Sequence, residues 1–477
     1  MRGMFNFGLL GIRRVFGGVM PPKPSIEKWV KEHMAFWYDM SKPVDVYSQN
    51  FNNWQNYNPN AVSITNNKII VNDLIDNFRI ASTGKETESF SVFIEGLGDK
   101  NLVYRVKLDE SSNEITNIKL KDGENILPKS FATTVAFMGT SGVTDYIGLT
   151  ITQLPSGQSV PTNEILKANP YLQDFSGNNR PLKLNNFLFA AMSGVGGYEY
   201  FSEDVTKTSA NKYETIIGNI TNINKPIRFS VHGLTELNTI DKNRGIVRIY
   251  STGNELFKVS ADGIYSFTVP SEYTSFSLQF GGGQSAAIPC NVVISPIPLY
   301  PNALVTDGVD DYGQVQNLQQ GVKVLFYTCN PFSLNKVFYD QRKVTSINES
   351  FFNIYIYNEN NKIAYNSRNI GGVTYIDGTL NDSLLANDLL NTKHIITIVN
   401  DGADENNTIS PIYFSTKLHN DYFANLAFYG SIGFDSIPTK ETDGFTEQEL
   451  ITWVIDTMIN GTPQSEAFPY VFPLKVS

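Results

Sequence analysis

Hydrophobic and polar residues alternate with a period of two along most of this chain. Runs such as FSVFIEGL at 90–97, IRFSVHGL at 227–234 and FFNIYIYNENN at 351–361 place every second side chain on one face, as in half-buried strands. Turn-forming Gly, Asn, Asp and Pro separate these runs. The pattern therefore predicts an all-β protein built from many short strands.

Two stretches have helical spacing instead. The first runs from Ser25, a suitable N-cap, to Asp39. The second follows Thr446 and Glu449, which have the spacing of a capping box before the apolar run LITWVIDTMI. We expect one short helix at each of these places and strands nearly everywhere between them.

Two parts of the chain follow the same plan. Gly96 and Gly233 each end a strand-like run, and Asp122 and Asp262 follow them 26 and 29 residues later. Both parts then close with a Pro-terminated alternating run, LTITQLP or VVISPIP. Each part has about six alternating runs, which is enough for a small antiparallel sandwich. The repeat predicts that residues 90–155 and 227–298 share one topology.

The length of 477 residues predicts two to four domains. A net charge of -10 without a basic stripe argues against a nucleic-acid partner. Cys290 and Cys329 are the only cysteines, so the fold is not a disulfide scaffold and suits synthesis in a reducing cytoplasm, although one bridge between them stays open. No stretch is long and apolar enough for a membrane span.

Residues 1–23 are apolar and end in a proline-rich spacer. Arg13 and Arg14 interrupt a run that otherwise resembles a signal peptide, so we expect it to stay uncleaved. The segment is too apolar for a free tail, and it packs either on its own domain or on a partner particle. The candidate docking residues are Phe5, Phe7, Arg13, Arg14 and Phe16.

Three motifs resemble the concanavalin-A-like, laminin-G-type jelly rolls. They are LQDFSGNN at 172–179, LVTDGVDDYGQV at 304–315, and ANLAFYGSIGFD leading to GFTEQELITWVI at 424–455. The resemblance implies a strand, a tight turn and a strand around Asp307 to Tyr312, with these residues in a structural role. It also implies a discontinuous jelly roll, because the two repeated parts interrupt the motifs.

The expected domain plan follows from these interruptions. An N-terminal docking segment occupies 1–23, and the jelly roll is assembled from 24–42, 156–202 and 301–477. One small β-sandwich is inserted at 43–155, and its repeat at 203–300. Insertion is physically permitted where the two ends of an inserted domain lie close together at a surface loop.

The combination of WYD, NPYLQDFSGN, MSGVGGYEYF and PLYPNALVTDGVDDY is also similar to virion proteins of tailed phages that infect gut Bacteroidales, the crAss-like group among them. Those proteins are head-fibre or tail-fibre components. The resemblance implies localisation in the virion after synthesis in the host cytoplasm, other virion proteins as partners, and adhesion to host-surface glycans. Since no coiled-coil stalk follows the first segment, self-association is expected through folded domains, as a dimer ahead of a trimer.

Enzymatic chemistry is expected to be absent, and no cofactor is expected. Glu441, Asp443 and Glu447 match the carboxylate spacing of some jelly-roll glycosidases, but Gly444 and the Thr446 helix cap remove them from any strand. The histidines lack a nucleophile motif and zinc spacing. We expect them to be structural: His33, His232, His394 and His419.

Two stretches could bind a ligand. The loop NDGADENN offers Asp401, Asp404 and Glu405 to calcium, although an ordinary solvated hairpin loop has the same residues. On the strand-like run at 351–361, Asn353, Tyr355 and Tyr357 share one face. That face suits a glycan or an interface between domains or subunits. The alternatives to a virion protein are a bacterial surface lectin or carbohydrate-binding module and, after it, a glycoside hydrolase.

Overall fold

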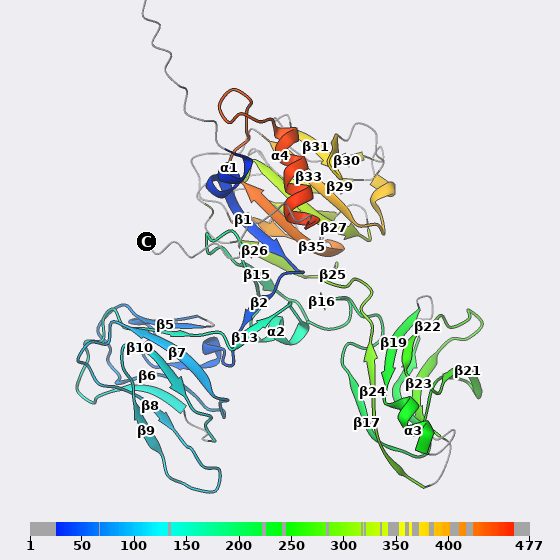
Figure 1. The fold of residues 1–477 in the computed structure, drawn as a ribbon, viewed down its shortest axis with the longest axis horizontal. Coiled ribbons are helices and arrows are strands. Elements are labelled where there is room, and N and C mark those ends of the chain that lie inside the picture. The colour runs from blue at the N-terminus through cyan, green and yellow to red at the C-terminus, as the bar shows by residue number, and fades with distance from the viewer. Residues whose placement is uncertain are drawn as a thin grey trace, which may run out of the picture.

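The chain folds almost entirely into antiparallel β-sheets, as the alternation predicts (Figure 1). Strands make up 45% of this computed structural model and helices 11%, which confirms the expected all-β sandwich class. The structure describes residues 25–461, except 66, 132–134, 222–225, 241–244, 283–285, 316–317, 319–320, 334–335, 342–352, 358–361, 365–371, 381–385, 401–409 and 416–422.

A central sandwich of two sheets is assembled from three separated parts of the chain. The eight-stranded sheet has the order β16 (Gly194–Val195), β25 (Leu304–Asp307), β35 (Asn425–Phe434), β27 (Val324–Pro331), β33 (His394–Asn400), β31 (Gly372–Ile376), β32 (Thr379–Leu380), with β1 (Met34–Asp39) also paired to β35. The seven-stranded sheet has the order β14 (Tyr171–Leu172), β15 (Leu182–Asn185), β26 (Tyr312–Val315), β34 (Ile412–Tyr413), β28 (Lys336–Asp340), β29 (Asn353–Tyr357), β30 (Lys362–Ala364).

Each face of the eight-stranded sheet is buried by a different set of residues. Its inner face packs on the seven-stranded sheet through rings such as Phe36, Tyr327 and Tyr413. Its outer face is covered by α1 (Ile26–His33) and α4 (Glu447–Trp453). The helix α4 continues into one π-helical turn, Val454–Ile459. Strands buried on both faces carry nearly continuous apolar runs. This explains the fully buried sequence VLFYTCNP in β27.

The first predicted helix is about half as long as its periodicity suggested. Ser25 caps it as expected, accepting a hydrogen bond from the Lys28 backbone N–H, but the helix ends at His33. Residues Met34–Asp39 form β1 instead, because their aromatic side chains fill both faces of the sheet. Tertiary burial here overrides the helical spacing. The second helix has the predicted capping box between Thr446 and Glu449.

Two further sandwiches are inserted into the central one, each with eight core strands. Insert 1 contains β5 (Lys68–Val71), β6 (Arg79–Thr83), β7 (Phe90–Glu95), β8 (Leu102–Val106), β9 (Thr116–Lys119), β10 (Gly123–Leu127), β11 (Val135–Gly139) and β12 (Thr150–Gln153), with β3 (Gln55–Asn56) and β4 (Val62–Ile64) added at its edges. Insert 2 contains β17 (Val205–Ala210), β18 (Glu214–Ile220), β19 (Ile227–His232), β20 (Ile246–Ser251), β21 (Asn254–Val259), β22 (Gly263–Phe267), β23 (Phe276–Gly281) and β24 (Ile288–Pro296).

The inserts share one strand order. Counting the eight core strands of each insert in sequence, one sheet runs 6-3-8-1 and the other 2-7-4-5 in both. Strand 1 therefore pairs with 8, 2 with 7, 3 with 6 and 4 with 5, which is the double Greek key of a jelly roll. The six alternating runs predicted within each repeat are core strands 3 to 8, and the first two strands lie upstream of the repeat.

The turn after the third core strand is also shared. Gly96 and Gly233 adopt positive φ, 77° and 85°, and the backbone N–H groups beside them donate to Asp122 and Asp262. A Cβ on either glycine would lie within 2.4 Å of a carbonyl oxygen of the facing chain. The spacing seen in the sequence thus marks a turn that only glycine fits.

Each insert joins the central sandwich through two antiparallel segments. In linker 1, β2 (Val44–Val46) pairs with β13 (Gly157–Ser159). In linker 2, the backbone N–H groups of Leu299 and Tyr300 donate to Gly197 and Gly196. Figure 1 shows both inserts extending from the same end of the central sandwich as separate bodies.

Several smaller elements were not expected from the sequence. The helix α2 (Asn163–Ala168) follows linker 1, and α3 (Leu234–Ile240) lies within insert 2. Two 3-10 turns cover Phe51–Asn53 and Ala386–Leu389. The two cysteines do not pair, since Cys290 lies in insert 2 and Cys329 in the central core. Within the described ranges, no helix is long and apolar enough to cross a membrane.

Candidate functional site

A hollow of about 140 Å³ lies on the outer face of the eight-stranded sheet, beside the end of the π-helical turn. The chain leaves for insert 1 and returns from insert 2 at this place. Its side chains come from six separate segments: Trp37, Asp39 and Ser41; Pro301 and Asn302; Thr328; Lys393; Tyr429 and Ile432; and Met458 and Ile459.

The hollow exists because two short strands share one long partner. The first half of β35 pairs with β25 and the second half with β1, so the ends of β1 and β25 meet along one edge. Tyr429 sits in a β-bulge at that junction, and its carbonyl accepts from the Met40 backbone N–H. Gly430 follows, where a Cβ would lie 2.6 Å from the Tyr38 carbonyl oxygen. Bulges of this kind redirect side chains and are frequent beside binding sites.

Two lysine–aromatic stacks flank the hollow. The ammonium of Lys42 lies 4.4 Å from the Trp37 ring centre, and that of Lys393 lies 4.3 Å from the Tyr429 ring centre. Burial lowers the pKa of Lys42, with Asp39 opposing it. Burial raises the pKa of Tyr429, so its phenol stays protonated at neutral pH. Each stack holds an aromatic wall in place.

The lining also offers the hydroxyl of Thr328. Thr328 is 5% exposed, and none of the residues that the structure describes forms a hydrogen bond with its Oγ1. A hydroxyl that faces the hollow without a protein partner can both donate and accept a hydrogen bond. The hollow therefore combines aromatic walls, a carboxylate, an ammonium and a free hydroxyl.

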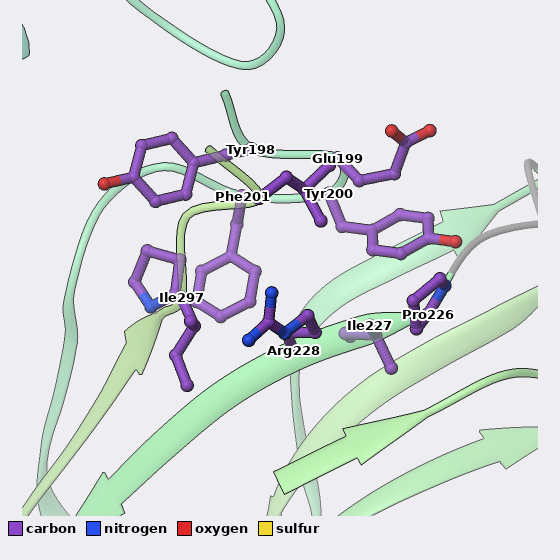
Figure 2. A pocket seen from close by; sticks show the side chains of 10 residues that line it. Tyr198, Glu199, Tyr200, Phe201, Pro226, Ile227, Arg228 and Ile297 are labelled. Carbon is purple, nitrogen blue, oxygen red and sulfur yellow. The ribbon is translucent and has the colours of Figure 1, made fainter. Parts of the chain in front are cut away.

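A second concave place lies where linker 2 enters insert 2. Figure 2 shows Phe201 of linker 2 and Arg228 of β19 side by side there, with Tyr198 and Tyr200 of linker 2 on either side. Its volume of about 10 Å³ leaves room for roughly one water molecule. Tyr200 packs on Phe276 of insert 2, with ring centres 5.4 Å apart. This place anchors the insert and is too small for a ligand.

The predicted ligand residues are only partly covered by the structure. Asn353, Tyr355 and Tyr357 lie on β29, which pairs with β28 and β30 near the edge of the seven-stranded sheet, but their side chains lie outside the described residues. The calcium candidates Asp401, Asp404 and Glu405 lie outside as well, as do the docking candidates Phe5, Phe7, Arg13, Arg14 and Phe16.

Three carboxylates that were not predicted as a cluster converge at the turn between β25 and β26. The ligand atoms of Asp307, Asp310 and Asp311 lie within 4.8 Å of one another. The buried Asp311 accepts from Ser193 Oγ at 2.9 Å and from the Asp307 backbone N–H at 3.0 Å. Burial raises its pKa to about 7, so it is partly protonated at neutral pH. These bonds account for the cluster as part of a turn that crosses between the two sheets.

The glycosidase-like carboxylates do not converge. Glu441 and Asp443 lie in the loop before α4, where Asp443 accepts from the Thr439 backbone N–H. Glu447 lies in the first turn of α4 and accepts from the Tyr375 hydroxyl at 2.6 Å. None of the three lies on a strand. Asp443 and Glu447 therefore serve the loop and the first turn of α4.

Three histidines are described, and each faces an aspartate. The Nδ1 atoms of His33 and His394 lie 3.0 and 2.8 Å from Asp435 and Asp377. His232 lies 3.4 Å from Asp262, beside the shared turn of insert 2. The fourth, His419, lies outside the described residues. The structural role expected for these histidines stays a prediction.

Sequence reasoning missed the hollow because its residues are far apart in the chain. WYD and PLYPNALV were singled out as motifs, and they supply Trp37, Asp39, Pro301 and Asn302 to one place. Their position on either side of the two insertions was the available signal. No family model matches this chain, and no curated protein sequence does.

Proposed function

We propose that this chain is a structural appendage protein of a tailed-phage particle, a fibre or decoration subunit that holds binding domains away from the particle surface. The observation that carries the proposal is the arrangement of the two inserts. The same jelly roll occurs twice, and each copy leaves the same end of one central sandwich on its own two-stranded linker.

Such an arrangement suits display more than catalysis. Two copies of one domain on one subunit, multiplied by the copies of the subunit on a particle, raise avidity without stronger individual contacts. Jelly rolls occur widely in capsid and lectin domains. Asp311, Glu447 and His394, which could have served catalysis, are instead engaged in a turn, at a helix start and in an ion pair. A weak adhesion role toward host-surface glycans fits this architecture.

A bacterial surface lectin is the second candidate, because the hollow would serve a lectin equally well. The two proposals differ in where the protein resides. Immunogold electron microscopy with an antibody against the recombinant chain tests this directly. Labelling of purified phage particles at one kind of structure supports the appendage, whereas labelling confined to a bacterial envelope contradicts it.

The docking role proposed for residues 1–23 has its own test. A chain that starts at Pro24 retains all the described strands and should fold and self-associate. We expect it to be missing from particles when it replaces the full chain, as measured by mass spectrometry of purified virions. Normal incorporation of the shortened chain would contradict docking through Phe5, Phe7, Arg13, Arg14 and Phe16.

A further inference from the structure

We infer that the hollow beside Thr328 binds one neutral sugar ring of a surface glycan. The inference rests on the proposed adhesion function and adds to it a ligand class and a site. Its first support is size, since about 140 Å³ is smaller than a typical drug-sized pocket of several hundred Å³ and suits a single ring.

The second support is the chemistry of the lining. A sugar ring presents hydroxyl groups that both donate and accept hydrogen bonds, and it has an apolar face of C–H groups. Asp39 can only accept, Lys393 can only donate, and the Thr328 hydroxyl does both. Trp37 and Tyr429 supply aromatic surface for the apolar face. The lining itself holds one carboxylate and one ammonium, and the second ammonium, that of Lys42, is engaged with the Trp37 ring at 4.4 Å, so we take a neutral sugar as the ligand.

The third support is preorganisation. Lys42 and Lys393 each stack on an aromatic ring of the lining, and the Tyr429 bulge is tied to Met40 through its carbonyl. A π-helical turn supplies Met458 to the wall, and such turns are frequent at functional sites. A site that is already ordered loses less entropy on binding.

The position of the hollow gives it a role that the inserts do not have. Its lining includes residues directly before insert 1 and directly after the linker that returns from insert 2. A glycan held there lies at the base from which both inserts extend (Figure 1). The central sandwich then contributes a contact of its own to adhesion.

The test uses the full chain and a panel of methyl glycosides of common neutral hexoses, 6-deoxyhexoses and N-acetylhexosamines. Saturation-transfer NMR identifies a binding glycoside, and calorimetry or NMR titration gives its Kd, which we expect in the millimolar range for one ring. Thr328→Val removes the hydroxyl without changing the shape of the side chain, and we expect it to weaken binding by roughly tenfold. Tyr429→Ala is expected to abolish detectable binding.

Thr397 offers a matched control. It lies on β33, on the same face of the same sheet as Thr328, and its buried hydroxyl also lacks a partner, but it does not line the hollow. Thr397→Val should leave the Kd unchanged. Circular dichroism and the melting temperature show whether each variant is folded.

Three results would overturn the inference. They are no glycoside binding at tens of millimolar, unchanged binding in Thr328→Val, or equal losses in Thr328→Val and Thr397→Val. Particle labelling is measured separately, so the appendage proposal can hold while this site fails. Glycoside binding by a protein found only on a bacterial envelope would keep the site and reject the appendage.

Discussion

Insert 1 and insert 2 have the same strand order, and in both an aspartate accepts hydrogen bonds from the turn at Gly96 or Gly233. They nevertheless differ in three features outside this shared scaffold. Insert 1 passes from its third to its fourth core strand through a short loop, whereas insert 2 places α3 there. The features that both inserts share lie where backbone N–H groups need a hydrogen-bond partner or where only glycine fits. The variable parts lie outside these constraints, so the repeat preserves the conditions for folding and leaves the surface open to change.

The second difference lies on the outer face of one sheet. A row of cross-strand neighbours reads Lys119, Val103, Met138, Arg79 in insert 1 and Lys258, Arg248, Gln279, Thr215 in insert 2. In insert 2 the Arg248 guanidinium lies 3.4 Å from the ring centre of Tyr213, and its Nε donates to Gln279 at 2.9 Å. The corresponding pair in insert 1, Val103 and Met138, is apolar.

The linkers are the third difference. In linker 1 polar groups hold the two segments, for example the Ser156 N–H and hydroxyl, which both donate to the Val46 carbonyl. Linker 2 is anchored by rings at both ends, since Tyr200 packs on Phe276 and Tyr300 lies 4.7 Å from Phe332. Insert 2 therefore has the better packed attachment.

The chain has three sandwiches, so comparing the inserts by calorimetry requires each unfolding transition to be assigned to one sandwich. A variant at Asp311 identifies the transition of the central sandwich. The folded pKa of Asp311, about 7, exceeds the ordinary value of 3.8 because of burial. The unfolded chain thus loses this proton first, and stability falls as pH rises from about 4 to about 7. We expect Asp311→Asn to remove this loss, which amounts to at most about 4 kcal/mol.

Differential scanning calorimetry at several pH values checks this prediction. At pH 8 one transition of Asp311→Asn should melt higher than in the parent chain, and at pH 4 the two proteins should agree. The transitions of the inserts should be unchanged at both pH values. A variant that is less stable at both pH values would show that the bonds from Ser193 and the Asp307 backbone need the carboxyl group.

The shared glycine turn gives the next largest effect. An alanine Cβ at position 233 would lie 2.1 Å from the Asn291 carbonyl oxygen, and at position 96 it would lie 2.4 Å from the Gly148 carbonyl oxygen. We expect Gly96→Ala and Gly233→Ala each to destabilise their own insert by roughly 2–4 kcal/mol, from the positive φ and the clash together. Calorimetry should show one transition lowered and the other unchanged.

Matched controls separate the two causes. Gly98 and Gly253 also have positive φ, but a Cβ at either position would meet nothing within 4 Å. Gly98→Ala and Gly253→Ala should therefore cost only about 1 kcal/mol. Equal losses in the controls and in the turn variants would mean that backbone conformation alone explains the shared glycine.

The sequence predicted the scaffold well because its rules are local. Alternation gave the β class, and the spacing from Gly96 to Asp122 and from Gly233 to Asp262 located an aspartate that binds a glycine turn. The repeat predicted that the two inserts share one topology, and their strand orders agree. The helix predicted from Ser25 to Asp39 was too long, because helical spacing cannot show that Trp37 and Tyr38 are buried on opposite faces of a sheet.

The candidate site could not be predicted in the same way. Thr328 is an ordinary strand residue in sequence, and only the contact of β27 with the bulge at Tyr429 places its hydroxyl in a hollow. The hollow depends on β1 and β25 meeting along β35, and this meeting joins segments more than 250 residues apart. Long-range register of this kind has no local signature.

Asp262→Asn is expected to have a smaller effect on insert 2. Burial opposes its charge, but backbone N–H bonds from Thr235, Gly233 and Leu234, with His232 nearby, lower its pKa. A lowered pKa stabilises the fold above the ordinary value of 3.8, and this stability is lost as pH falls below it. We expect a loss of about 1 kcal/mol at pH 7. Calorimetry near pH 2.5 should show a smaller difference, and an equal difference at both pH values would contradict the role of the charge.

The smallest expected effect concerns the outer face that distinguishes the inserts. Replacing Arg248 and Gln279 together, as Arg248→Val and Gln279→Met, gives insert 2 the apolar pair that insert 1 has at Val103 and Met138. The double variant loses one hydrogen bond, the ion pair with Glu255 and the stacks on Tyr213 and Tyr250, but Glu255 keeps Lys258 as a partner and the strand gains a β-branched side chain. We expect insert 2 to change by less than about 1 kcal/mol, a shift of a few degrees in its melting temperature. The matched reverse variant, Val103→Arg with Met138→Gln, should be tolerated equally by insert 1. If either double variant instead abolishes its transition, the outer face is part of the folding requirement, and the two inserts differ in how they fold as well as in what they display.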